Sequence, residues 1–133
     1  MKYLIDTHVC LWAVAETHKL SVHVKEILEE PATEIIYSQI SLLEIAIKFQ
    51  TGKLPDFDIT LEVLNDTLQQ KGFTLQLLTN EHLYAYFNCN FFSEQHKDPF
   101  DRCLAAIAYS EQIGFITKDD KFQLYANRIQ VVW

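Results

Sequence analysis

Short apolar segments that alternate with helical segments are the feature of this 133-residue chain that most restricts its fold. The apolar segments are rich in Ile, Val, Leu and Phe, as expected for strands of a sheet that is covered on both faces. The helical segments between them carry apolar residues at helical spacing. This alternation predicts an α/β fold, a three-layer α/β/α sandwich with a mainly parallel central sheet. The expected strands are residues 3–5, 34–37, 73–78, 115–117 and 129–133.

Several of the expected helices have recognisable ends. Ser21 is a favourable N-cap, Pro31 and Gly72 follow helical segments, and Asp98 precedes Pro99, a residue that suits the first helical position. The expected helices are residues 9–15, 22–30, 40–50, 59–70, 80–87, 98–108 and 121–125.

The composition supports one core and gives no sign of a membrane protein. Residues 1–133 are expected to form a single domain, because 49% of them are hydrophobic and only three Gly and three Pro leave little room for linkers. Three cysteines without metal-binding spacing indicate buried thiols in a reducing compartment. An acid close to the N-terminus argues against a signal peptide, and no apolar run is long enough to cross a membrane. We therefore expect a cytoplasmic location.

The formal net charge of −7 differs from the basic balance that is typical of nucleic-acid-binding proteins. It does not exclude a nuclease, because an acidic centre that binds metal lowers the net charge by itself. The question is then where the acids are placed along the chain.

Four acidic clusters follow strand-like runs or lie on apolar helix faces. A buried charge is costly unless something compensates it, and the carboxyl ends of parallel strands meet at one edge of a sheet. One divalent cation would compensate all four clusters, and carboxylate oxygens suit Mg²⁺ or Mn²⁺ and the cleavage of phosphodiester bonds. The clusters are Asp6, Glu44, Asp98 with Asp101, and Asp119 with Asp120.

Local structural roles are the alternative for the first two clusters. Asp6 can cap the helix that follows it, since Asp is a common N-cap. Glu44 can complete a Ser-x-x-Glu capping box with Ser41. Against that reading, Glu44 shares a helix face with Ile40 and Ile47, so it is expected to point inward.

The other two clusters also have such alternatives. Asp98 is better explained as an N-cap, although a role at the site stays open. Asp101 can favour the helix dipole, but it lies at the edge of the buried face. Asp119 and Asp120 can be ordinary turn residues, and Asp119 is favoured for the site because it closely follows a strand.

Neighbouring polar side chains can support such a site. Ser38 and Thr117 lie near strand ends and can orient carboxylates. His96 can contact substrate or an acid, and it is not assigned as a metal ligand. Trp12 and Trp133 are expected in the core rather than as platforms on which bases stack.

Four motifs in this order point to a known family. The motifs span essentially the whole chain and include Leu4-Ile5-Asp6-Thr7-His8, Ser38-x-x-Ser41-Leu42-Leu43-Glu44, His96-x-Asp98-Pro99-Phe100-Asp101-Arg102 and Thr117-x-Asp119. With these motifs the chain resembles the PIN-domain ribonucleases, and the branch that it resembles most is that of the VapC-type toxins of prokaryotic toxin–antitoxin pairs.

The resemblance implies an endoribonuclease that depends on one or two Mg²⁺ or Mn²⁺ ions, is inhibited by a small antitoxin and commonly forms a homodimer. It assigns catalysis and metal binding to an acidic quartet of Asp6, Glu44, Asp101 and Asp119, and it leaves a contribution from Asp98 open. Leu43 departs from the branch, which often has Trp before the Glu. Residues with a supporting or substrate-binding role are Ser38, Thr117, His96 and Arg102, with Lys48 and Lys118 as further candidates to hold the RNA backbone.

Two other classes of function are compatible with the acids. A phosphatase or a DNA nuclease can use the same cluster, although a haloacid-dehalogenase-type phosphatase needs an Asp where His8 stands. A non-catalytic interaction or receiver-like module is the other alternative, and it offers no role for Glu44.

Overall fold

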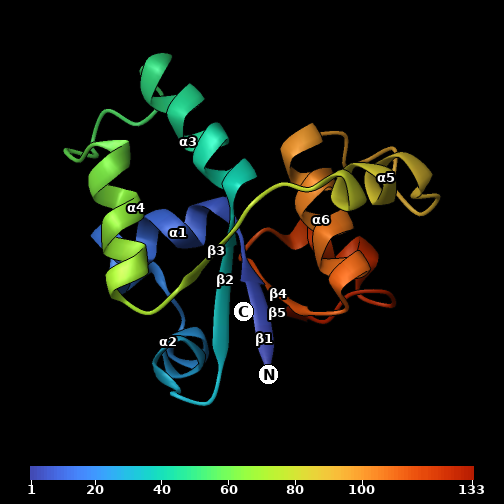
Figure 1. The fold of residues 1–133 in the computed structure, drawn as a ribbon, viewed down its shortest axis with the longest axis horizontal. Helices are drawn as coiled ribbons and strands as arrows, with labels where there is room; N and C mark the ends of the chain where they lie inside the picture. The colour runs from blue at the N-terminus through green and yellow to red at the C-terminus, as the bar shows by residue number, and fades with distance from the viewer.

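Five parallel strands form one sheet, with the order β3-β2-β1-β4-β5 (Figure 1). The computed structural model describes all residues from 1 to 133. The α/β prediction is confirmed, and the sheet is wholly rather than mainly parallel. The strands are β1 (Lys2–Ile5), β2 (Glu34–Ser38), β3 (Thr74–Gln76), β4 (Gly114–Ile116) and β5 (Val131–Val132).

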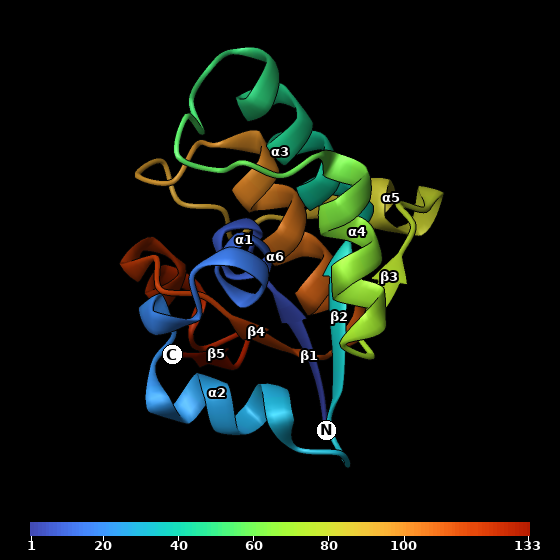
Figure 2. The same ribbon diagram turned by 90° about the vertical axis from the view of Figure 1, so that its left-hand side faces the viewer.

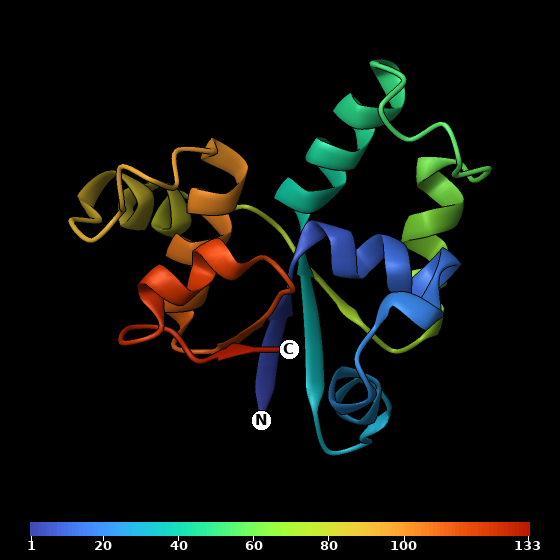
Figure 3. The ribbon, with the colours of Figure 1, turned by 180° about the vertical axis from the view of Figure 1, so that it is seen from behind.

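Helices cover both faces of the sheet, so the three layers that were expected are present (Figures 1 and 3). Helices α1 to α4 lie on one side, and α5, α6 and η2 lie on the other, as the side view of Figure 2 also shows. None of the helices is both long and apolar enough to cross a membrane. The helices are α1 (Thr7–Ala15), η1 (Thr17–Lys19), α2 (Val22–Glu29), α3 (Gln39–Gln50), α4 (Leu61–Gln70), α5 (Asn80–Asn88), α6 (Pro99–Glu111) and η2 (Asp120–Tyr125).

Alternating side chains of the central strands divide the core into two clusters. Tyr3 and Ile5 of β1 join the cluster under α1, α2 and α4, whereas Leu4 between them joins the cluster under α6 and η2. This follows from the two-residue repeat of a strand, which points successive side chains to opposite faces. Apolar residues at every position are therefore required, and this explains the continuous apolar runs in the sequence.

The ends of several elements differ from the sequence predictions. The two edge strands β3 and β5 are shorter than expected because each pairs with only one neighbour. The short helix predicted over residues 121–125 is a 3₁₀ helix, and η1 was not predicted. The N-caps expected at Ser21 and Asp98 are confirmed, since each side chain accepts a hydrogen bond from the first helical turn.

The strand order reverses at β1. From β1 the chain moves outward through β2 to β3 and later returns to place β4 on the other side of β1. Ligands of such sheets bind beyond the carboxyl ends of the strands at this switch point. The residues that follow β1 and β4 are Asp6 and Thr117, which places both of them there.

The contact between β4 and β1 gives a test of the core. Gly114 pairs with Tyr3, and a Cβ atom at Gly114 would lie 2.5 Å from Cδ1 of the Tyr3 ring. We expect Gly114→Ala to reduce the free energy of unfolding by roughly 1–3 kcal/mol, the usual cost of overpacking. Chemical denaturation of the variant and the wild type measures this difference in the free energy of unfolding. In a Tyr3→Val background the same substitution should cost much less, and an equal cost in both backgrounds would contradict this explanation.

Candidate metal centre

Asp6 is held in a fixed orientation at the end of β1. It is 4% exposed, and one carboxylate oxygen accepts the Thr7 backbone N–H at 2.7 Å while the other accepts the Thr117 hydroxyl at 2.7 Å. Asp6 is thus the N-cap of α1 and also a buried carboxylate at the switch point. Burial raises the pKa of Asp6 above its usual range, and the charge of Glu44 adds to this; the hydrogen bonds from Thr117 and Thr7 offset part of the shift.

Glu44 reaches the same region from the second turn of α3. Helix α3 begins at Gln39 after the N-cap Ser38, so Ser41 lies inside the helix and the capping-box alternative is wrong. The Glu44 side chain is buried, with Oε2 at 3.1 Å from Nζ of Lys48 and with Oε1 lacking any hydrogen-bond partner. A buried carboxylate oxygen without a partner is unfavourable unless a cation or water satisfies it.

Asp101 is joined to a chain of hydrogen bonds on the opposite side of the sheet. Its Oδ2 lies 3.0 Å from Nε2 of the buried His96, and Nδ1 of His96 lies 3.1 Å from the Tyr125 hydroxyl. Burial, followed by the charges of Asp6 and Asp98, raises the pKa of Asp101 to about 6, and the hydrogen bond with His96 opposes this. His96 therefore orients Asp101.

The loop before α6 holds this arrangement in place. Arg102 donates from Nε to the His96 carbonyl at 2.6 Å and from Nη2 to the Ser93 carbonyl at 2.9 Å. Asp98 accepts the backbone N–H of Asp101 at 2.9 Å as the N-cap of α6. The structure thus uses Arg102 and Asp98 to build the start of α6; their roles toward RNA and metal stay predictions.

The last acidic cluster follows β4. Asp119 is the N-cap of η2: it accepts the Lys121 backbone N–H at 3.0 Å and donates its own backbone N–H to the Thr117 hydroxyl. Asp120 is exposed in the first turn of η2. The position of Asp119 favours it over Asp120 as a ligand.

These elements bring the acids together. Asp119, Asp101 and His96 each offer one potential ligand atom, and these atoms lie within 4.8 Å of one another. Asp6 interacts electrostatically with Asp101 and with Glu44. Both ring nitrogens of His96 already face protein partners, so we regard the acids rather than His96 as the metal-binding groups.

The donor set fits a divalent cation that prefers oxygen ligands. Burial raises the pKa values of Asp6 and Asp101, so hydrogen bonds from the protein compensate their buried charge only in part. The unpartnered Oε1 of Glu44 offers a further ligand atom. Carboxylate oxygens alone are typical of Mg²⁺ and Mn²⁺ sites, and nothing in the set favours zinc.

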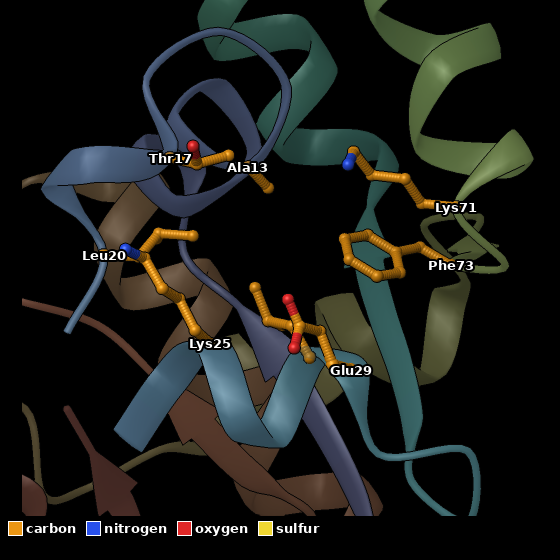
Figure 4. A pocket seen from close by; sticks show the side chains of 8 residues that line it. Ala13, Thr17, Leu20, Lys25, Glu29, Lys71 and Phe73 are labelled. Atoms are coloured by element: carbon orange, nitrogen blue, oxygen red, sulfur yellow. The ribbon is translucent and has the colours of Figure 1, made fainter. Parts of the chain in front are cut away.

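The centre opens into a cavity of about 530 Å³. Asp6 and Asp119 both contribute to its wall. A slightly larger cavity of about 570 Å³ lies between η1, α2 and the start of β3, and Figure 4 shows its lining side chains. None of the acids of the centre lines that second cavity, so we place the chemistry in the first.

Some contributors were missed by sequence reasoning. The Thr7 hydroxyl donates to Ser41 at 3.0 Å and ties the start of α1 to α3, and Tyr125 supports His96 from η2. No sequence signal pointed to either contact, since both join residues far apart in the chain. The pairing of Lys48 with Glu44 could have been found from their four-residue spacing. Ser38 caps α3 through the backbone N–H of Ile40, and its role toward the carboxylates stays a prediction.

The fold and the site together define an α/β protein with an acidic centre at the switch point of a parallel sheet. The PIN domain model matches residues 3–128. The chain therefore belongs to the PIN domain family. No curated protein matches the chain.

Solved structures share this fold. VapBC2 from Rickettsia felis, bound to a DNA fragment from its promoter, matches with a TM-score of 0.67 and 20% identity over 99% of this chain and 98% of that chain. VapBC-1 from nontypeable Haemophilus influenzae matches with a TM-score of 0.68 and 18% identity over 99% and 97%. DNA-bound VapBC from Salmonella typhimurium matches with a TM-score of 0.68 and 13% identity over 99% and 97%.

The raised pKa of Asp101 gives a prediction for the metal-free protein. A group whose pKa rises from 3.8 to about 6 on folding stabilises the fold at low pH and loses that contribution as the pH rises through 6. In EDTA, Asp101→Asn should therefore gain stability relative to the wild type as the pH rises from 5 to 8. Thermal unfolding at both pH values measures the difference in stability between the variant and the wild type. Mg²⁺ at pH 8 should reduce this difference, because it stabilises the wild type alone. A difference that is independent of pH would contradict the assignment.

Proposed function

We propose that this protein is a metal-dependent endoribonuclease that hydrolyses RNA phosphodiester bonds. The observation that supports it best is the closeness of acids from separate elements: Asp101 and Asp119 offer ligand atoms within 4.8 Å of one another, and Asp6 interacts electrostatically with Asp101 and Glu44. One buried carboxylate oxygen of Glu44 has no hydrogen-bond partner. The acids are Asp6, Glu44, Asp101 and Asp119. A purely structural role would leave such a cluster destabilising, because like charges at close range repel.

The chain supplies the positions at which the reaction takes place. In hydrolysis, a water molecule adds to phosphorus, one P–O ester bond breaks and the leaving oxygen takes up a proton. When bound, Mg²⁺ or Mn²⁺ lowers the pKa of a coordinated water and neutralises charge on the phosphate. Asp6 and Asp101 are oriented for this by Thr117 and His96, so little reorganisation is needed.

Lysines close to the centre can contact the RNA backbone. Lys118 and Lys121 line the same cavity as Asp6 and form no ion pair, whereas Lys48 is paired with Glu44. Contacts to phosphate position a nucleic acid without reading its sequence. We therefore assign backbone binding to Lys118 and Lys121 in preference to Lys48.

Membership of the PIN family, together with the resemblance to its ribonuclease branch, favours RNA over DNA or a phosphomonoester. A non-catalytic module is the less favoured alternative, because it gives no role to the buried Glu44 with its unpartnered oxygen. Activity on single-stranded RNA, on the matching DNA and on a small phosphomonoester separates these readings.

Substitution of single acids tests the assignment. Asp6→Asn and Asp119→Asn should each lower RNA cleavage at least 100-fold, since losing even a supporting partner of a ligand typically costs about 10- to 100-fold. Asp56→Asn, the matched control, should stay close to the wild type because Asp56 is exposed and lies outside the cavity of the centre. Cleavage of a fluorescent RNA in Mg²⁺ or Mn²⁺, followed by EDTA, is the measurement. Full activity of Asp6→Asn would overturn the proposed function.

We further propose that the chain is the toxin of a VapC-type toxin–antitoxin pair, acting in the cytoplasm. Support comes from the fold shared with the VapBC structures over nearly their whole matched chains. Exposed apolar side chains are available for a small antitoxin and for a second copy of the chain in a homodimer. They include Leu43 and Ile47 on α3 and Leu83 and Phe87 on α5.

Expression in a bacterial host tests this role. The wild-type chain should arrest growth, and Asp6→Asn, expressed to the same level, should not. Co-expression of the short reading frame beside the gene should relieve the arrest and yield a complex that co-purifies. Growth arrest by Asp6→Asn equal to that by the wild type would contradict a toxic role through RNA cleavage.

A further inference from the structure

The cavity beside the acidic centre has an unusual wall. Six of its seven lining residues are charged or titratable, and the seventh is Trp12. An aromatic ring as the single hydrophobic side chain among charged ones suits a ligand that combines a flat apolar part with charged groups. The lining residues are Asp6, His8, Trp12, Lys118, Asp119, Asp120 and Lys121.

We propose that Trp12 is a substrate-binding residue on which a base of the RNA stacks, next to the phosphate that is cleaved. The proposal rests on the proposed function and adds a subsite to it. A nucleotide has the required combination, since its base has an aromatic face and its phosphate is anionic. Base stacking on an aromatic side chain is largely independent of sequence, because every base has such a face.

Trp12 packs against the core, as the sequence suggested, but lies at its edge. Its side chain is partly buried against the core cluster under α1, and it also lines the cavity that contains Asp6. The two residues lie six positions apart, with Asp6 at the N-cap of α1 and Trp12 within the helix. A base on Trp12 would therefore lie close to a phosphate at the centre.

Neighbouring aromatic side chains hold the Trp12 ring in one orientation. Trp133 packs edge-on against it with ring centroids 5.9 Å apart, and His8 lies tilted against it at 5.7 Å. A ring that is already fixed loses little freedom when it binds a ligand. Trp133 does not line the cavity, so it supports Trp12 without facing the ligand.

Two lysines stand beside the ring, and one of them, Lys19, is paired with Glu16 and does not line the cavity. Nζ of Lys118 lies 5.9 Å from the Trp12 centroid, at the limit of a cation–π interaction, and Lys118 forms no ion pair. This weak contact leaves Lys118 free to bind a phosphate when a base occupies the ring. The alternative is that Trp12 and Lys118 only stabilise the fold. The two explanations differ in whether a substitution of Trp12 weakens the binding of RNA by the folded protein.

Kinetics with matched variants separate them. Trp12→Leu should raise KM for a short RNA by about 5- to 150-fold, the range expected for one lost stacking interaction, with a smaller change in kcat. Trp12→Phe keeps an aromatic face and should recover most of the loss. Phe87→Leu is the matched control: it removes an exposed aromatic ring on α5, outside the cavity, and should leave KM unchanged. Thermal unfolding of each variant shows whether it is folded under the assay conditions.

An abasic scan of the RNA identifies the partner of Trp12. Bases are removed from the RNA one at a time. At one position beside the cleavage site, removal of the base should lower the activity of the wild type but should not lower the activity of Trp12→Leu any further. Equal losses in both proteins at every position, or an unchanged KM in Trp12→Leu, would overturn the proposal.

A binding measurement keeps this result distinct from a failure of the proposed function. The anisotropy of a labelled RNA, titrated with protein in Mg²⁺, reports binding whether or not cleavage occurs. Cleavage with unaltered binding by Trp12→Leu refutes the Trp12 subsite alone. If the wild type shows no metal-dependent cleavage, the proposed function is refuted. If, in addition, RNA binds equally well to the wild type and to Trp12→Leu, the Trp12 subsite is refuted as well.

Discussion

The hydrogen bond from the Thr117 hydroxyl to Asp6 joins the carboxyl ends of β1 and β4 at the point where the strand order reverses. It also fixes one oxygen of a carboxylate that is almost completely buried. Because Asp6 caps α1 with its other oxygen, the first helix and the acidic centre depend on the same side chain. The geometry of the centre is thereby tied to the geometry of the sheet.

The centre works against the stability of the fold that holds it. Desolvation raises the pKa values of Asp6 and Asp101, and one oxygen of Glu44 has no partner. The cost is carried by the two apolar clusters on either side of the sheet, and its natural compensation is a bound cation. Strain of this kind is common at functional sites, where a protein gives up stability for a preorganised arrangement.

The placement of the acids was predictable because they interrupt strong apolar patterns, while their role as metal ligands stays a prediction. Asp6 and Asp119 follow strand-like runs, and Glu44 lies on an apolar helix face. Two supporting contacts were also predictable: Thr117 orients a carboxylate and His96 contacts an acid, as expected from their positions. The contacts of Tyr125 and Arg102 were not, because they depend on the conformation of the loop before α6. Trp12 packs against the core as expected, but that it also lines a cavity could not be predicted, since a partly buried ring and a buried one have the same sequence signal.

The sequence by itself determined the class of fold, the two-sided burial of the sheet and the identity of the acids, since these follow from local periodicity and from charge in apolar surroundings. Only the tertiary structure decided which strands are neighbours, and through this which acids face one another. It also decided that Ser41 is a partner of Thr7 rather than a cap, and that the cavity beside the centre contains one tryptophan. These outcomes depend on contacts between residues distant in the chain, which local pattern does not encode.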